Sequence, residues 1–302
     1  MQAIKIGTLV SADNIKEKIS HLAGYGFETF SITFGDNAGA YDLSALARDT
    51  REALDGTGSA ISSVSVYGNP LLDTESGLRT RESWIELIDA AERFGTDLVA
   101  GFTGRLTGVP VDESMPKFKE VFTYIVKYAQ DKGVRIAFEN CFMGGNWERG
   151  DWNIAVNPDA WELMFAALPA ENIGLEWEPC HQILQLIDPA RQLRQWAPKV
   201  FHLHGKDANI HRDILATRGI HAPGGGRADN KAFSDHRFPG FGDSDWRELI
   251  TILHQHQYAG TIDIEGWHDP VYRGDLEMTG QVASLQYLKR CRAGDFVPNP
   301  TA

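Results

Sequence analysis

Acidic and histidine side chains stand at alternate positions in four β-like segments of the second half of the chain. The segments are VRIAFEN (134–140), NIGLEWE (172–178), KVFHLHG (199–205) and GTIDIEG (260–266). Side chains of a strand alternate between its two faces. The polar residues of each segment therefore share one face. That face carries Arg135, Ala137 and Glu139, then Gly174, Glu176 and Glu178, then His202 and His204, and lastly Asp263 and Glu265, whereas Phe201 and Leu203 belong to the opposite face.

Carboxylates on a buried face are costly unless positive charge compensates them. The last polar residues of the four segments supply three carboxylates and one imidazole: Glu139, Glu178, His204 and Glu265. This oxygen-rich set suits Mn²⁺, Mg²⁺ or Co²⁺ better than a thiolate-type zinc site does. The alternative is ion pairing with neighbours, for which Arg135 and Lys206 are available. Because the same pattern recurs in four consecutive segments, we favour a divalent metal ion, with Mn²⁺ as the first choice.

The elements that must position these residues alternate between β-like and amphipathic helical patterns. Strands are expected at 3–10, 27–34, 60–67, 96–103, 134–140, 172–178, 199–205 and 260–266. Eight such units in 302 residues predict an α/β fold, a (β/α)8 TIM barrel that forms one domain over residues 1–302, with extended loops after the fifth and seventh strands. The polar strand ends would then meet at the carboxyl end of the barrel, where barrel active sites lie.

An open doubly wound sheet is the alternative architecture. Its usual dinucleotide fingerprint is absent, because IGTLVSADN after the first strand contains no GxGxxG. The glycine-rich stretch APGGGRAD (222–229) does not run from a strand into a helix, and we interpret it as a loop.

Composition narrows the function classes. Hydrophobic residues make up 42% and charged residues 23%, which is typical of a soluble globular protein, and the net charge of −12 disfavours nucleic acid as a partner. No apolar run is long enough to cross a bilayer, and the first residues lack a signal-peptide pattern. The scattered Cys141, Cys180 and Cys291 fit a reducing compartment, so we expect a cytoplasmic protein without membrane contact.

Several stretches are similar to those of a known family. They are FEN (138–140), WEPCH (177–181), HLHGKD (202–207), RFPGFGDSDW (237–246) and YAGTIDIEG (258–266). Through them the chain resembles the sugar phosphate isomerase/epimerase superfamily, the xylose isomerase-like barrels. That superfamily includes ketohexose 3-epimerases, hydroxypyruvate isomerase, inosose dehydratase and barrel subunits that cleave 3-keto glycosides.

The resemblance implies one metal ion held by Glu139, Glu178, His204 and Glu265. The family usually has Asp at the position of Glu178, so either the longer Glu178 binds or Glu176 takes that role. His181, in the EPCH stretch, is expected beside the metal and the substrate.

The implied chemistry begins with a cation that polarises a sugar carbonyl. Glu139 and Glu265 would then exchange protons with the adjacent carbon through an enediolate, giving an isomer or an epimer of a ketose or keto-sugar. The same enolate also permits β-elimination from a keto-inositol or a 3-keto glycoside, with His181 or Lys206 protonating the leaving group. The chain would thus be an isomerase or epimerase in carbohydrate metabolism, or else a lyase.

A DNA-repair nuclease on the same barrel is disfavoured, because such enzymes need histidines from early strands and His21 is the only histidine before His181. A non-catalytic sugar-binding protein is a further alternative.

Residues 205–245 form a long connection, which suggests a lid or an interface. Within it, Arg237 is predicted to contact substrate, the alternative being a surface arginine. Asp245 and Trp246 are expected to cap and anchor the seventh helix. We expect a small-molecule sugar as partner, and a homo-oligomer or partner subunit is compatible with the sequence.

In the connection after the fifth strand, Trp147 and Trp152 could stack on a sugar or pack the loop. Cys141 and Cys180 are expected to be small packing residues.

Overall fold

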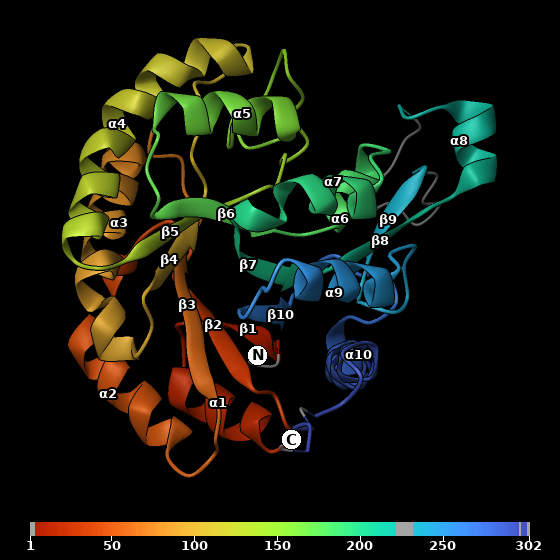
Figure 1. The fold of residues 1–302 in the computed structure, drawn as a ribbon. Helices are drawn as coiled ribbons and strands as arrows, with labels where there is room; N and C mark the ends of the chain where they lie inside the picture. The colour runs from red at the N-terminus through yellow and green to blue at the C-terminus, as the bar shows by residue number, and fades with distance from the viewer. Residues whose placement is uncertain (1–3, 222–231, 296, 301–302) are drawn as a thin grey trace.

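The computed structural model describes residues 4–221, 232–295 and 297–300, and its centre is a closed barrel of eight parallel strands (Figure 1). Neighbouring strands follow the order β1-β10-β7-β6-β5-β4-β3-β2. The strands are β1 (Lys5–Ser11), β2 (Thr29–Thr33), β3 (Ala60–Val66), β4 (Leu98–Gly101), β5 (Arg135–Glu139), β6 (Ile173–Trp177), β7 (Val200–Gly205) and β10 (Thr261–Ile264). The predicted (β/α)8 TIM barrel is confirmed, and each predicted segment coincides with one barrel strand, although β1 extends one residue past its predicted end.

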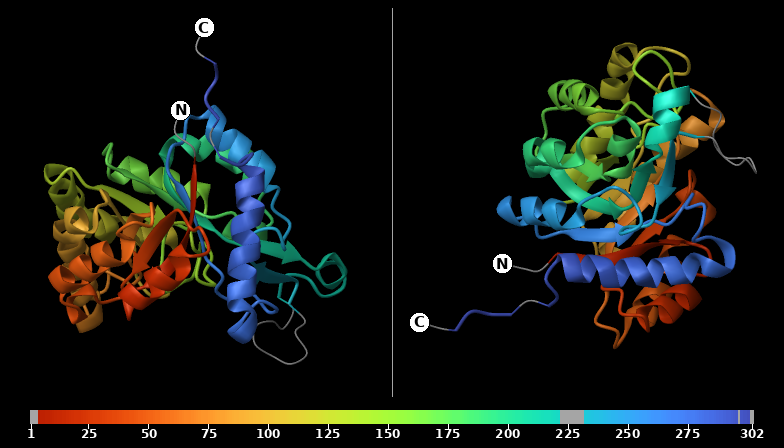
Figure 2. Two further views of the ribbon diagram at one scale, coloured as in Figure 1. Left: turned by 90° about the horizontal axis from the view of Figure 1, so that it is seen from below. Right: turned by 90° about the vertical axis from the view of Figure 1, so that its right-hand side faces the viewer.

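Helices surround the barrel, and the apolar core lies between them and the outer faces of the strands. They are α1 (Ile15–Ala23), α2 (Leu43–Leu54), α3 (Glu75–Phe94), α4 (Val111–Asp131), α5 (Pro158–Ala167), α6 (Cys180–Leu184), α7 (Pro189–Trp196), α9 (Trp246–Gln255) and α10 (Glu277–Cys291), with 3-10 turns η1 (Ala38–Ala40), η2 (Ala197–Lys199) and η3 (Gly274–Leu276). Figure 2 shows α10 lying along the side of the barrel, where it contacts β1, β10 and α9. None of the helices in the described part of the chain is long and apolar enough to cross a membrane.

The connection after β7 contains secondary structure of its own and is not a plain loop; we call it the excursion. An antiparallel ribbon of β8 (Asp207–Ile210) and β9 (Ser234–Arg237), together with α8 (Arg212–Arg218), projects from the barrel (Figure 1). Asp207 anchors its base, because its carboxylate accepts hydrogen bonds from the Ser244 backbone and from Trp246 Nε1. Burial raises the pKa of Asp207 to about 6. The glycine-rich stretch 222–229 lies outside the described residues.

The expected helix cap at Asp245 is confirmed. Its side chain accepts hydrogen bonds from the backbone amides of Arg247 and Glu248, the first donors of α9 that lack helical partners. The expected core position of Trp246 is also confirmed, because this side chain is fully buried.

The predicted outward orientation of Phe201 is wrong. The β6–β7 pairing shifts register, so that Leu175 pairs with Val200 and Glu176 with His202, which leaves Phe201 as an extra residue. A β-bulge of this kind redirects one side chain. Phe201 turns into the barrel and packs against Leu98, Ala100 and Ala137.

Gly7 of β1 makes room for a carboxylate inside the barrel. A Cβ atom at this position would lie 2.0 Å from Asp263 Oδ1 and 2.1 Å from Thr29 Oγ1. Those two atoms are joined by a hydrogen bond of 2.6 Å. The absence of a side chain at Gly7 therefore allows β2 and β10 to place a hydrogen-bonded carboxylate in the centre.

We expect Gly7→Ala to lower the free energy of unfolding by about 1–3 kcal/mol, the usual cost of an overpacked core. Urea denaturation of the purified variant measures this change. Gly24→Ala is the matched control, because Gly24 has a helical φ of −62° and a Cβ there would come no closer than 3.6 Å to its neighbours. Equal stability of the two variants would contradict the proposed crowding at Gly7.

Candidate active site

The carboxyl end of the barrel brings together Glu139, Glu178, His204 and Glu265, and one potential ligand atom from each lies within 4.8 Å of the others. Glu139 ends β5 and His204 lies near the end of β7, whereas Glu178 and Glu265 follow directly after β6 and β10. The first three are buried and Glu265 is partly exposed. We call these residues the four-residue group.

His204 lies at the centre of the four-residue group. Its Nδ1 is 2.9 Å from Glu139 Oε1 and 3.2 Å from Glu265 Oε2, and its Nε2 is 3.1 Å from Glu176 Oε1. Burial lowers the pKa of His204, but the surrounding carboxylates outweigh this effect and raise it well above its usual value. Burial likewise raises the pKa of Glu139 to about 8, against the opposing influence of His204. Protons on Glu139 and His204 therefore offset part of the negative charge of the group.

A second layer of hydrogen bonds lies below this group and fixes Glu176. Its Oε1 is 2.7 Å from His202 Nδ1, and its Oε2 accepts a hydrogen bond of 2.8 Å from the Tyr67 hydroxyl. His202 Nε2 in turn lies 2.6 Å from Asp263 Oδ2. Burial alone would raise the pKa of Glu176, but His204 and His202 lower it to about 2. Glu176 is thus an ionised side chain whose two oxygens already have partners.

Glu178 differs from Glu176 because its carboxylate forms no hydrogen bond, although His181 Nε2 lies 2.5 Å from its Oε1. Neither carboxylate oxygen has a hydrogen-bond donor among the described residues, although the side chain is buried. Its backbone is fixed, because the Asn140 side chain accepts from Glu178 N at 2.9 Å and donates to Glu178 O at 3.0 Å. An unpaired buried carboxylate is costly, and a cation would satisfy it. The geometry therefore favours Glu178 over Glu176 as the ligand from this strand.

Lys206 and His181 lie beside the four-residue group. Lys206 Nζ contacts Glu265 Oε1 at 2.5 Å. Burial opposes the charge of both groups, but their attraction raises the pKa of Lys206 and lowers that of Glu265. His181 Nε2 lies 2.5 Å from Glu178 Oε1, in an orientation that does not form a hydrogen bond.

Ion pairing with basic residues accounts for only part of the acidic cluster. Lys206 pairs with Glu265, but Arg135 pairs with Asp97 at 2.8 Å instead of reaching the carboxylates. Burial alone would raise the pKa of Glu178, but attraction to His181 and Lys206 nearby outweighs burial and lowers this pKa. The donor set and the unpaired Glu178 oxygens fit a divalent cation.

Arg237 is anchored at the edge of the excursion. Its Nε lies 3.1 Å from Asp269 Oδ2, and its guanidinium stands over the ring of Phe241. The Asp269 carboxylate also accepts a hydrogen bond from Phe238 N. Arg237 is therefore not a free surface side chain, and its contact with substrate stays a prediction.

Sequence reasoning missed several residues that hold the site. Tyr67 follows directly after β3, the same place in its unit as Glu178 and Glu265 in theirs, and this position was the available signal. Asn153 ties the loop after β5 to the site by donating to the carbonyl oxygens of Glu139 and Cys141. Arg105, fully buried, supports the same loop by donating to the carbonyl oxygens of residues 146 and 147, and it also donates to that of residue 109, before α4.

The tryptophans of this loop differ in exposure. Trp147 packs against the core, whereas Trp152 is 45% exposed. Packing explains Trp147, and Trp152 remains available for contact with a ligand.

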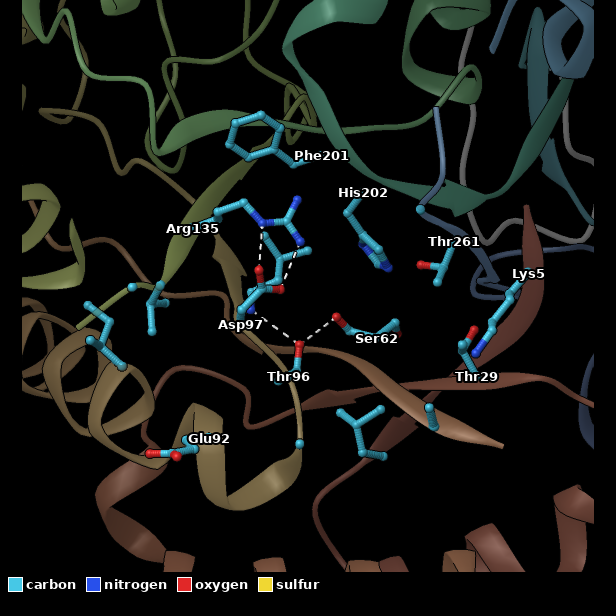
Figure 3. Close-up of a pocket in the computed structure, with 18 of the residues that line it drawn as sticks. Lys5, Thr29, Ser62, Glu92, Thr96, Asp97, Arg135, Phe201, His202 and Thr261 are labelled. Carbon is cyan, nitrogen blue, oxygen red and sulfur yellow. Dashed lines mark hydrogen bonds and ion pairs between the residues drawn. The ribbon is translucent and has the colours of Figure 1, made fainter. Parts of the chain in front are cut away.

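A cavity of about 720 Å³ lies at the opposite, amino end of the barrel (Figure 3). Its polar groups are largely satisfied, as Arg135 pairs with Asp97 below Phe201 and Thr96 Oγ1 donates to Ser62 O. In TIM barrels this end contributes to stability, whereas reactions occur at the carboxyl end. The four-residue group lies at the other, carboxyl end of the barrel.

The barrel fold and the buried acidic residues at its carboxyl end indicate the class of protein. The family model described as "Xylose isomerase-like TIM barrel" matches residues 19–291. The chain therefore belongs to this family. A curated relative, the uncharacterized protein YfiH of Bacillus subtilis, is 23% identical over 291 residues, which cover 83% of this chain and 87% of the relative.

Solved structures share the fold over nearly the whole chain. A xylose isomerase domain protein from Planctomyces limnophilus aligns with a TM-score of 0.72, at 17% identity, over 96% of this chain and 98% of its own. A 3-keto-D-glucoside 4-epimerase from E. coli gives 0.68, at 18% identity, over 95% and 100%. A D-psicose 3-epimerase gives 0.69, at 13% identity, over 96% and 100%.

We expect the chelator-treated protein to lose stability as pH rises above neutrality. Burial raises the folded-state pKa of Glu139 from 4.5 to about 8, so the contribution of its proton to stability is fully present below pH 4.5 and is lost as pH rises through 8. The raised pKa of His204 has the same sign, with its contribution present below pH 6.5 and lost above it. Each group contributes a slope of at most about 1.4 kcal/mol per pH unit.

Urea unfolding at a series of pH values from about 6 to about 9, which bracket these transitions, measures this loss. Glu139→Gln should show a shallower decline, because one of the two titrating groups is removed. A stability that rises over this range in the chelated wild-type protein would contradict the assignment.

Proposed function

We propose that the chain is a divalent-metal-dependent isomerase or epimerase that acts on a ketose or keto-sugar through an enediolate. The observation that carries this proposal is the convergence of three carboxylates and one imidazole, with both oxygens of Glu178 unpaired. Family membership and the sugar epimerases of the same fold support it.

Glu139, Glu178, His204 and Glu265 would hold the ion. When bound, a divalent cation such as Mn²⁺, Mg²⁺ or Co²⁺ supplies polarisation of the substrate carbonyl and stabilises negative charge on the adjoining oxygens. Hard oxygen donors predominate in the set, which favours these ions over softer ones. The small neutral or anionic sugar would enter from the partly exposed Glu265 side.

Glu139 and Glu265 would act as the proton-exchanging pair. They reach His204 Nδ1 from β5 and β10, which lie on opposite sides of β7 in the barrel order. One carboxylate can therefore remove a proton from a carbon of the substrate, and the other can return a proton from a different side. Return to the opposite face of the same carbon gives an epimer, whereas return to the neighbouring carbon gives an isomer.

Lys206 and His181 would bind the substrate hydroxyl groups and keep the two carboxylates in place. The short Lys206–Glu265 contact holds Glu265 ionised, as required of a base. His181, next to Glu178, lies where a hydroxyl of a bound sugar would reach it. Arg237 completes the proposed substrate contacts from the excursion after β7.

A metal-dependent lyase is the second candidate. The observation that favours it is the buried Lys206 ammonium beside Glu265, a proton donor in reach of the same base. Proton removal by a carboxylate, followed by protonation of a leaving oxygen by Lys206 or His181, would eliminate water or an aglycone from the β-carbon. A keto-inositol or a 3-keto glycoside has the required arrangement.

Activity assays distinguish the two reactions. With a ketohexose and a 3-keto glycoside in D₂O, we expect interconverted sugar that carries deuterium, detected by NMR. Glu139→Gln and Glu265→Gln should each lower kcat by about 10²–10⁴-fold, the usual contribution of an acid or base. Glu162→Gln, an exposed residue of α5, is the control and should leave kcat unchanged.

Released water or aglycone without deuterated sugar would favour the lyase instead. Full activity after exhaustive chelation would refute metal dependence for both reactions.

Metal titration tests the choice between the two glutamates of β6. We expect Glu178→Gln to weaken Mn²⁺ binding by more than about 100-fold, since it removes a ligand. Glu176→Gln should weaken it by about 10–100-fold, as is typical of residues that orient a ligand. Isothermal titration calorimetry on the chelated proteins measures both, and a larger loss in Glu176→Gln would transfer the ligand role to Glu176.

A further inference from the structure

Two β-bulges shape the cavity at the amino end of the barrel, which we call the amino-end cavity. Between β2 and β3, Phe30 pairs with Ile61 and Ser31 with Ser63, which leaves Ser62 as an extra residue. The bulge between β6 and β7 inserts Phe201 in the same way. Both inserted residues line the amino-end cavity. Bulges at barrel rims redirect side chains and often accompany binding sites.

Lys5 brings a positive charge without a partner to this cavity. Its neighbours Ile4 and Ile6 are fully buried in the apolar core outside the barrel, so alternation places Lys5 on the inner face of β1. Figure 3 shows Lys5 on the opposite side of the cavity from Arg135. Among the residues that the structure describes, no ion pair or side-chain hydrogen bond involves the Lys5 ammonium group.

The other charged side chains of the lining are paired or exposed. Arg135 pairs with Asp97 at 2.8 Å, and Lys132 pairs with Asp89 at 2.7 Å. Glu92 forms no ion pair within the described part of the chain, but it lies exposed near the end of α3. The free charge in the interior of the cavity is therefore the lysine of β1.

A layer of hydrogen-bonded side chains separates this cavity from the four-residue group. Thr29 and Thr261, which both line the cavity, donate to the two oxygens of Asp263 at 2.6 and 3.1 Å. Asp263 also contacts His202 at 2.6 Å, and His202 contacts Glu176 at 2.7 Å. Three partners thus surround the Asp263 carboxylate, which reduces its repulsion of an anion in the cavity. A molecule bound there would not reach the four-residue group.

The size and apolar surfaces of the cavity favour an organic ligand over a simple inorganic anion. Its volume of about 720 Å³ lies within the usual range of small-molecule pockets. The ring of Phe201 supplies apolar surface, and the Arg135 guanidinium stands over this ring, 5.4 Å from its centroid. Leu98 and Val134 add aliphatic surface to the lining.

We propose that the amino-end cavity is a binding site for a small organic carboxylate, with its anionic group on Lys5 and its apolar body against Phe201. A carboxylate there would supply the partner that the Lys5 ammonium lacks, in a charge-assisted hydrogen bond. This site is independent of the proposed sugar reaction, because it uses neither the four-residue group nor its neighbours Lys206 and His181.

Fluorine NMR titration of the full-length chain with 4-fluorobenzoate tests the proposal. We expect saturable line broadening of the probe, with a Kd of about 1 mM or tighter for a ligand of this size. The neutral analogue 4-fluorobenzyl alcohol should bind about 10-fold more weakly, because it lacks the charge that pairs with Lys5. Absence of saturable binding by 4-fluorobenzoate, or equal binding of the two probes, would overturn the proposal.

Variants at the two ends of the barrel locate the bound probe. Lys5→Gln should weaken 4-fluorobenzoate binding by about 10-fold, and Ala60→Phe should abolish it by filling the cavity that Ala60 lines. Lys127→Gln is the control of matched charge, since Lys127 is an exposed residue of α4 outside the cavity, and it should leave the Kd unchanged. Lys206→Gln, at the carboxyl end, should also leave the Kd unchanged.

Unchanged binding in Lys5→Gln and Ala60→Phe, both shown to be folded by circular dichroism, would exclude the amino-end cavity as the site. Loss of binding in Lys206→Gln alone would instead place the probe at the four-residue group. Neither result would bear on the proposed sugar reaction, which is measured separately by deuterium incorporation.

Discussion

The burial of negative charge inside the barrel is the constraint on which the rest of the site depends. Glu176 and Asp263 are fully buried, and Glu139 and Glu178 nearly so, in a region that most barrels fill with branched apolar side chains. Each must be compensated by a proton, a cation or hydrogen bonds, because an isolated ion in such surroundings is strongly unfavourable. The compensation differs with depth: His202 and hydroxyl groups contact the lower carboxylates, whereas Glu178, at the upper level, has no hydrogen-bond donor among the described residues.

This difference with depth distinguishes a carboxylate that orients a neighbouring side chain from those proposed to bind an ion. Glu176 has partners on both oxygens and directs His204 from below, and His202 in turn is held between Glu176 and Asp263. Such supporting contacts would fix the orientation of His204 in the proposed metal site, as partners of metal-binding imidazoles do. Even the glycine at position 7 takes part, because a side chain there would displace Asp263.

Strand parity was sufficient to predict the barrel and the convergence of Glu139, Glu178, His204 and Glu265, because alternation and strand polarity together fix both face and end. It failed at Phe201, where a bulge inserts an extra residue that no alternation rule anticipates. It also could not choose between Glu176 and Glu178, since both lie on the same face. That choice depends on partners from distant elements, Tyr67 after β3 and His202 on β7, which only the folded chain brings together.

The surroundings of loop residues could not be predicted from sequence periodicity, for a different reason. Cys141 was expected to be a small packing residue, and its side chain is indeed buried. Its surroundings, however, are fixed by two side-chain amides. Asn153 donates a hydrogen bond to the carbonyl oxygen of Cys141, and Asn140 accepts one from the backbone amide of Glu178. These contacts place candidate ligand atoms of Cys141, Glu178 and His181 within 4.8 Å of one another. Glu178 therefore differs from Glu176 in its surroundings: its carboxylate has His181 Nε2 at 2.5 Å but no hydrogen-bond donor among the described residues, whereas both oxygens of Glu176 have partners.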